Sequence, residues 1–327
     1  MLSGTAGVAE VGAAAAPAAQ SSAASAAPAE PIAQIEVTGE RAGPRLWRVS
    51  RAGAHADHVA WILGTLDPLP RRMSWKSHQV EDVIAQAQEV LADRPSVSGI
   101  GPIMAIRLYL QYRRAEKIPD HSTLQSLLPG PLYARFTALK MRYDPHDRRI
   151  EELRPGVAAL RLYERTLESS GLTSSNLIQD TVLELARKHG VRVVRISLRL
   201  QDPRGVLTEV SEVPRATEIG CLEATVQRLE TDLGPMQARA QAWARGDVDA
   251  LRHLALPNQR QVCLDAVASA PRFRQLLDQV SREWDAALET SLAQNQTTLA
   301  MRPIYDLLGD NGTLARLRAR GYVVEGP

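Results

Sequence analysis

The sequence predicts an α/β fold: a single domain with a mixed β-sheet core and a helical insertion. Two strand-like runs, Leu46–Ser50 and Val59–Gly64, lie near the start, and two more, Thr297–Met301 and Tyr322–Glu325, lie near the end. The residues between them carry mostly helical spacing of apolar side chains. Strands at both ends of a chain with helices between them favour one sheet that receives an inserted helical region.

Composition and charge narrow the function classes. The chain has 39 basic and 37 acidic residues, a net charge of +2. Such a balance gives no electrostatic case for nucleic acid or an anionic membrane as partner, because both usually require a strongly basic face. No stretch approaches the roughly 20 apolar residues of a transmembrane helix, so we expect no transmembrane segment.

The first residues differ from the rest, and we expect residues 1–44 to be a disordered leader or linker preceding a domain at 45–327. Ala13–Pro31 is nearly all Ala, Ser and Pro, a composition that buries too little apolar surface to offset its ordering entropy. Small residues also suit a signal-peptide cleavage site. However, Glu10 interrupts the apolar run, and the first basic residue is Arg41. A truncated signal and a low-complexity tail both remain open.

The first structured elements are predicted to be a hairpin, a helix and a buried strand. A polar turn separates Leu46–Ser50 from Val59–Gly64, which is typical of a β-hairpin. Asp67 and Pro68 then end the second strand. A helix over Ser77–Gln88 and a short strand over Glu89–Ala92 follow, and the Gly- and Pro-containing residues 94–102 indicate a loop.

The middle of the chain is predicted to be mostly helical, with one further strand. Gly190 is typical of a residue that ends a helix, and Val191–Ile196 follows it as the clearest strand of the chain. Residues 203–215 are predicted to be a loop. The expected helices before this loop are Ile103–Arg114, Ser122–Leu128, Pro131–Met141, Arg149–Ser169 and Thr181–His189.

A long helix follows, with apolar residues at spacings of three and four that predict a buried face. Its stripe consists of Ile219, Leu222, Val226, Leu229 and Leu233. The remaining expected helices are Pro235–Trp243, Val248–Leu254, Asn258–Ala268, Pro271–Asn295, one around Tyr305, and Thr313–Arg320.

The strand motifs resemble those of a known family. Leu46–Val49 and Trp61–Asp67 are similar to the opening strands of TraB/GumN proteins, which include the Tiki-type peptidases. Leu314–Val324 resembles the closing helix and strand of that family, and Ile150–Pro155 resembles its helix after the insertion. The resemblance covers about residues 45–327 and points to the GumN-like branch. It implies an erythromycin-esterase/ChaN-like fold.

The family resemblance also implies a metal-dependent hydrolase. Two G-x-x-H motifs would bring histidines to a shared divalent metal, with a glutamate after the second core strand. A metal held in this way lowers the pKa of a bound water and polarises a carbonyl.

This sequence departs from the family at each of these places. The first motif runs from Gly64 and Thr65 to Asp67, where the family has histidine. The second falls near Leu299–Pro303, which contains neither glycine nor histidine, and Asp93 is the only carboxylate near the glutamate position. Asp67 and Asp93 are weak candidates for a hard-metal pair. We therefore expect no bound cofactor.

Three hypotheses for function remain. The first is a non-catalytic periplasmic or envelope protein on a metallohydrolase scaffold, with an envelope peptide or polysaccharide as its ligand. The second is an active peptidase-like hydrolase with a rearranged carboxylate site. The third is a purely structural envelope protein. Because functional sites vary on a shared fold, the fold alone does not choose between them. A cleft that contains Asp67 at the ends of the core strands would be the most informative observation.

Three other groups carry weaker functional hypotheses. His55 and His58 have ligand-like spacing but lie in a predicted turn. His146, with Asp144 and Asp147, could bind a cation, although the sequence there is typical of a polar turn. Trp75 could stack on a sugar or peptide, or could anchor the helix that follows it.

Cys221 and Cys263 are the only two cysteines. Exported proteins commonly pair an even number of cysteines, whereas buried free thiols behave as small apolar groups. Because the family resemblance and the Ala/Ser/Pro leader both indicate export, we expect a disulfide and a periplasmic or secreted location. Such a bridge should stabilise the fold by roughly 4 kcal/mol.

Overall fold

The computed structural model describes residues 43–51, 53, 57–119, 122–254, 263, 270–309 and 311–326. These residues belong to one structural unit, residues 40–327. Most of the predicted leader (residues 1–44) and most of the predicted helix Asn258–Ala268 lie outside the described residues.

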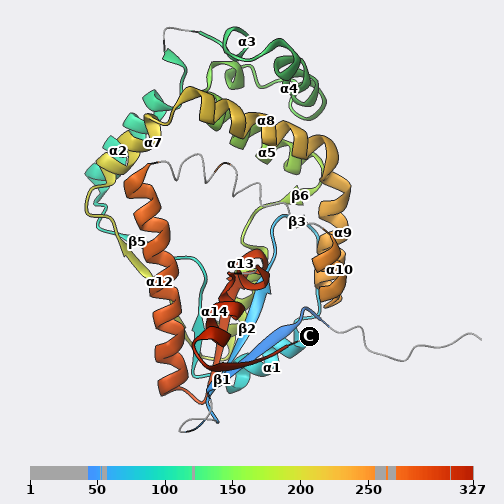
Figure 1. The fold of residues 1–327 in the computed structure, drawn as a ribbon, viewed down its shortest axis with the longest axis vertical. Helices are drawn as coiled ribbons and strands as arrows, with labels where there is room; N and C mark the ends of the chain where they lie inside the picture. The colour runs from blue at the N-terminus through green and yellow to red at the C-terminus, as the bar shows by residue number, and fades with distance from the viewer. Residues whose placement is uncertain are drawn as a thin grey trace, which may run out of the picture. The chain divides into compact units, whose positions relative to one another are not determined.

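A six-stranded sheet forms the centre of this unit (Figure 1). All six predicted strands belong to it, which confirms the mixed α/β fold. The strands β2, β9, β4 and β7 run parallel, and β1 pairs antiparallel with both β10 and β2. In the order in which they pair, the strands are β10 (Tyr322–Glu325), β1 (Leu46–Arg51), β2 (Val59–Thr65), β9 (Thr297–Pro303), β4 (Glu89–Leu91) and β7 (Arg192–Val194).

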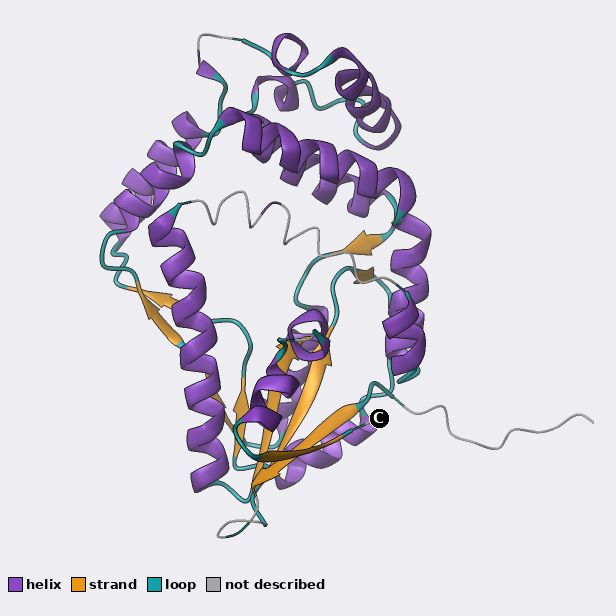
Figure 2. Cartoon of the chain, viewed as in Figure 1, coloured by secondary structure: helices purple, strands orange, loops and turns teal. Residues whose placement is uncertain are grey.

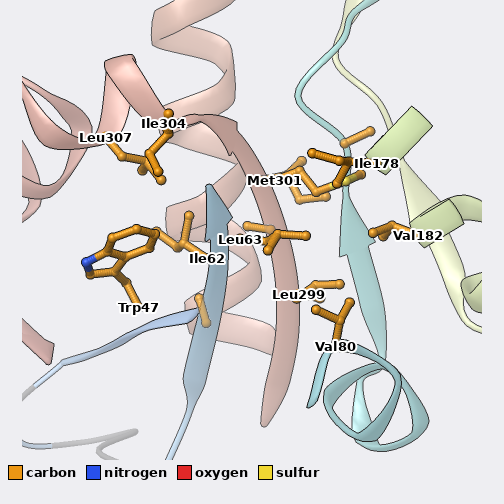
Figure 3. Packing of buried hydrophobic residues seen from close by; sticks show 14 of the residues in the cluster. Trp47, Ile62, Leu63, Val80, Ile178, Val182, Leu299, Met301, Ile304 and Leu307 are labelled. Carbon is orange, nitrogen blue, oxygen red and sulfur yellow. The ribbon is translucent and has the colours of Figure 1, made fainter. Parts of the chain in front are cut away.

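Apolar residues on both faces of the sheet make its core. On one face, Leu299 and Met301 lie toward Val80 of α1 (His78–Gln86) and Val182 of α6 (Leu177–Lys188), as Figure 3 shows. Ile62 instead lies on the side of Trp47 and Ile304 (Figure 3). The long helix α12 (Pro271–Gln294) packs against β2, β9 and β4 through its buried Trp284 and Leu288. Strands covered by helices on both faces are typical of parallel sheets.

The helical insertion has a second apolar core of its own, built around the predicted stripe. Leu222, Val226 and Leu229 are buried against Phe136 and Leu162. The helices of the chain beyond α1, α6 and α12 are shown in Figure 2. They are α2 (Pro102–Ala115), α3 (Leu124–Leu127), α4 (Gly130–Tyr143), α5 (Pro155–Ser169), α7 (Pro203–Ser211), α8 (Arg215–Thr231), α9 (Leu233–Ala244), α10 (Val248–His253), α13 (Ile304–Leu308) and α14 (Thr313–Ala319).

Three predictions for the helical region need correction. The predicted apolar stripe does not lie on one helix, because α8 ends at Thr231 and Leu233 begins α9. The loop predicted at 203–215 was wrong, because α7 occupies Pro203–Ser211. Asp202 caps it by accepting a hydrogen bond from the backbone N–H of Gly205 at 2.9 Å, and Pro203 suits the first helical position. The helix predicted over Arg149–Ser169 is interrupted: Arg149–Glu152 is a 3₁₀ turn, and α5 begins at Pro155. Proline disfavours helical geometry in the residue before it.

Two small two-stranded sheets were not predicted. β3 (Leu69–Pro70) pairs with β6 (Leu172–Thr173), and β5 (Ser96–Ser98) pairs with β8 (Ser197–Arg199). Each strand has only two or three residues, too few for an alternating pattern, and its partner is about a hundred residues away. Within the described part of the chain, no helix combines the length and the apolar character needed to cross a membrane.

Candidate functional site

The parallel strands bring three separate chain segments to one edge of the sheet. Gly64 of β2 pairs with Arg302 of β9, and Leu91 of β4 pairs with Ala300 of β9. The residues that follow these strands therefore meet at their carboxyl ends. In open α/β sheets, this edge is where ligands bind.

Asp67 is held at this edge by Tyr305 and faces a cation. The Tyr305 hydroxyl donates to the backbone carbonyl of Asp67 at 2.8 Å and accepts from its N–H at 3.3 Å. The carboxylate lies 3.8 Å from the guanidinium of Arg94. The residue at the family's first histidine position is thus an anion with an arginine beside it.

Gly64, at the start of the same motif, is favoured by close packing. A β-carbon there would lie 3.1 Å from the Trp47 ring and 3.2 Å from Ile304. The Gly64 carbonyl accepts a hydrogen bond from the indole N–H of Trp243 at 2.6 Å. This glycine therefore lets three elements approach the end of β2, a role in packing that needs no metal.

Asp93 lies next to Thr65, whose hydroxyl donates to one carboxylate oxygen at 3.3 Å. The other oxygen, Oδ1, is buried and has no hydrogen-bond partner among the described residues. Burial raises the pKa of the Asp93 carboxyl above its usual range, against the opposing effects of Arg94, Thr65 and Arg302. A carboxyl with a raised pKa and unused hydrogen-bonding capacity is a candidate for function.

Arg302, like Arg94 and Tyr305, is a residue of this edge that the sequence analysis did not propose. Its side chain is buried, with the guanidinium 4.8 Å from the centre of the Trp284 ring. It donates to Ser281 at 3.2 Å and lies 3.7 Å from Asp306. Its charge also acts on Asp93. An arginine at the end of an otherwise apolar strand was the available signal.

The residues of this edge do not fit the metal that the family resemblance implies. Asp67 has Arg94 beside it, the charges of Arg94 and Arg302 act on Asp93, and a guanidinium is a donor that offers no lone pair to a cation. Among the residues that the structure describes, no group of three or more His, Cys, Asp or Glu side chains could hold a metal ion. Divalent sites commonly use three or more protein ligands.

A cleft of about 530 Å³ begins at the strand ends and continues into the helical insertion. Asp67, Arg94 and Tyr305 line it at the sheet, so it meets the criterion set from the sequence. Farther along, its walls are mainly apolar, with two tyrosines. Representative wall residues are Tyr112, Val157, Leu160, Tyr163, Val210 and Val213.

One buried ion pair also lines this cleft. Arg154 lies 2.9 Å from Glu218, and it donates to the backbone carbonyls of Ser211 and Val213. Burial raises the pKa of Glu218, and Arg154 opposes that rise. Because Arg154 joins α5, α7 and α8, it braces the wall of the cleft.

The residues near the other sequence candidates, the histidine pair, the His146 turn and Trp75, have partners within the protein. His58 hydrogen-bonds the carbonyl of Leu292 at 2.9 Å, and His55 lies outside the described residues. Beside His146, Asp147 accepts from two backbone N–H groups and pairs with Arg161, while Asp144 lies 3.3 Å from Arg165. Trp75 packs edge-on against Trp243, with ring centres 5.5 Å apart, so it anchors its segment to the core.

Cys221 and Cys263 form a disulfide with Cα atoms 4.9 Å apart, which confirms the predicted bridge. Both cysteines line the cleft. The bridge ties residue 263 to the middle of α8, on the side of the cleft away from the sheet.

Comparisons with known proteins agree with the resemblance in the strand motifs. Residues 45–326 match the family model described as the TraB/PrgY/gumN family. Neither the curated proteins nor the solved structures gave a match to this chain. Because the family model spans nearly the whole chain, this protein belongs to the TraB/PrgY/gumN family.

Proposed function

We propose that this protein binds a ligand in the cleft and has no metal-dependent hydrolase activity. The carrying observation is the Arg94 guanidinium 3.8 Å from the Asp67 carboxylate, together with the buried side chain of Arg302, whose charge acts on Asp93. These cations occupy the electrostatic role that a divalent metal would have.

Electrostatics supports this choice. A divalent cation would have to displace the Arg94 guanidinium from Asp67 and would be repelled by the buried charge of Arg302. The Arg94–Asp67 pair is 42% and 34% exposed and is weak by itself, so the buried Arg302 contributes most of the repulsion, because the effective dielectric constant around it is low. The two carboxylates alone are also fewer ligands than catalytic metals commonly have.

The walls of the cleft suit a peptide or polysaccharide of the cell envelope. Tyr112 and Tyr163 offer rings that can stack on a sugar or a peptide side chain, while Asp67 and Arg94 offer polar contacts at the sheet. The disulfide supports a periplasmic or secreted location, because such bridges persist in oxidising compartments.

A rearranged hydrolase is the second candidate, and Asp93 is the observation that favours it. A buried carboxyl with a raised pKa can serve as a general acid or base near neutral pH. In that case Asp93, which is hydrogen-bonded to Thr65 at the end of β2, would act on a substrate that enters from the cleft.

A panel of envelope peptides and glycan fragments, incubated with wild-type protein and Mn²⁺, Co²⁺ or Zn²⁺, separates the two candidates. We expect binding without turnover. Turnover that disappears in Asp67→Ala and Asp93→Ala would establish the hydrolase.

A matched pair of variants tests whether binding uses the cleft. Leu160 and Leu277 are both exposed leucines on helices, but only Leu160 lines the cleft. We expect Leu160→Glu to abolish ligand binding and Leu277→Glu to leave it unchanged. Equal affinities in both variants would remove the cleft from the proposal.

A further inference from the structure

The helix α2 exposes an unusual amount of apolar surface. None of its 14 residues is buried. Ten large apolar side chains are exposed in the described part of the chain, and five of them belong to α2. These five are Ile103, Ile106, Tyr109, Leu110 and Tyr112.

The helix has one face on the protein and another directed away from it. At 100° per residue, Met104, Leu108 and Gln111 share the first face. Gln111 donates to Thr208 of α7 at 3.2 Å, and the two helices lie side by side (Figure 1). Ile103, Ile106 and Leu110 share the outward face, where they are 68%, 61% and 52% exposed.

Positive charge accompanies this outward face. Residues 102–117 contain three arginines and one lysine against one glutamate, so the segment carries 4 − 1 = +3, more than the +2 of the whole chain. Arg113 pairs with Glu116 at 2.6 Å and Lys117 with Glu152 at 2.9 Å. Arg107 and Arg114 project beside the apolar stripe, at the angular positions that border it.

We infer that α2 docks on an anionic lipid surface. An apolar stripe bordered by arginines, with Tyr109 on the same helix, matches helices that lie in the membrane interface. The apolar side chains would enter the acyl boundary while the arginines meet lipid phosphates. With 14 residues, about 21 Å long, α2 is too short to span a bilayer.

Docking of α2 on lipid does not depend on the ligand of the cleft. It also differs from what the net charge of the chain indicates about membranes. The near-neutral total charge of the chain gives no reason to expect a membrane partner. The structure gathers cations and apolar side chains on one helix. Because salt screens charges beyond about 10 Å, binding depends on the local charge of this helix and not on the net charge of the chain.

Vesicle sedimentation of the full chain tests the inference. We expect binding to vesicles that contain phosphatidylglycerol, little binding to phosphatidylcholine vesicles, and weaker binding as salt is raised. The double variant Ile103→Asp/Ile106→Asp should lower the affinity roughly tenfold or more. The control Met141→Asp/Leu277→Asp changes two exposed apolar residues on other helices and should bind as wild type does.

A second variant separates charge from fold. Arg107→Gln/Arg114→Gln keeps the apolar stripe, and we expect it to bind more weakly with a shallower dependence on salt. Melting temperatures should stay near wild type, because substitutions of exposed side chains rarely change stability measurably. Absence of vesicle binding, or equal binding by all variants, would overturn the inference. A dimer that dissociates in Ile103→Asp/Ile106→Asp would assign the face to a second copy of the chain instead.

Discussion

A carboxylate lies at each end of strand β4, and the two carboxylates differ in how fully they are hydrogen-bonded. At the amino end, Glu89 accepts hydrogen bonds from Ser291 at 2.7 Å and Asn295 at 3.5 Å, and it pairs with Arg192. At the carboxyl end, Asp93 accepts one bond from Thr65, and its Oδ1 has no partner in the described structure.

This difference separates a structural polar group from a candidate functional one. Buried polar atoms are nearly always hydrogen-bonded. Eight buried side-chain atoms of the described structure have no partner, and Oδ1 of Asp93 is distinguished among them by its place at the carboxyl ends of the strands. The Nε of Arg302 is a second such atom at the carboxyl end, and it has no hydrogen-bond partner among the described residues. The amino end of the sheet is satisfied internally, whereas the carboxyl end keeps capacity for a ligand or water and adjoins the cleft.

Removing the disulfide should lower the free energy of unfolding more than any other change proposed below. It should leave the amino end of the sheet intact. The bridge joins residues 42 apart in the sequence, so Cys221→Ser/Cys263→Ser should lower the free energy of unfolding by about 4 kcal/mol. Hydrogen exchange should rise in α5 and α8 while the protection of β4 and β9 stays high. A loss of protection that begins in the sheet would contradict this division of the molecule.

Replacing Glu89 should have the next largest effect. Glu89→Ala removes the acceptor for Ser291 and Asn295 in a buried site, and we expect a loss of about 2–3 kcal/mol in urea unfolding. The control Glu89→Gln keeps the size and one acceptor oxygen, so it should lose less. If both variants unfold at the wild-type midpoint, the network at the amino end does not stabilise the fold.

Replacing Asp93 should change the free energy of unfolding less than replacing Glu89, and it should raise that free energy instead of lowering it. Because burial raises the pKa of Asp93, its carboxyl favours folding below the ordinary pKa of aspartate. That contribution is lost as the pH rises through the raised pKa. Asn does not titrate, so Asp93→Asn should equal or exceed wild-type stability at pH 7, by up to about 1 kcal/mol.

The pH dependence provides the check on Asp93. The stability advantage of Asp93→Asn should grow from acid toward neutral pH and then level off. An advantage that shrinks as the pH rises would mean that the folded state favours the charged carboxylate, and Asp93 would then resemble Glu89.

The sheet could be predicted from sequence because each strand carries its own local signal. Val59–Gly64 and Thr297–Met301 are apolar runs bounded by polar or proline residues, and apolar content marks strands buried on both faces. By contrast, α7 was missed. Its glycine and proline resemble a loop, although Asp202 followed by Pro203 is itself a signal in the sequence for the start of a helix.

The candidate site was only partly predictable. Family motifs located Asp67 and Asp93, but they could not show which cations face them. Arg302 reaches its position through the register of β2 with β9, a pairing of residues more than two hundred apart. The exposed face of α2 was likewise hidden, because a helical pattern does not reveal which side the rest of the chain covers.

Calorimetric titration with Mn²⁺, Co²⁺ and Zn²⁺ tests most directly whether arginines replace the metal at the carboxyl end. We predict no one-to-one binding of micromolar or tighter affinity to the wild-type protein, and the same result for Asp67→Ala. Binding that survives Asp67→Ala would point instead to His55 and His58. Tight one-to-one binding that disappears in Asp67→Ala would contradict the proposal, because it would show that Asp67 still ligates a metal in spite of Arg94 and Arg302.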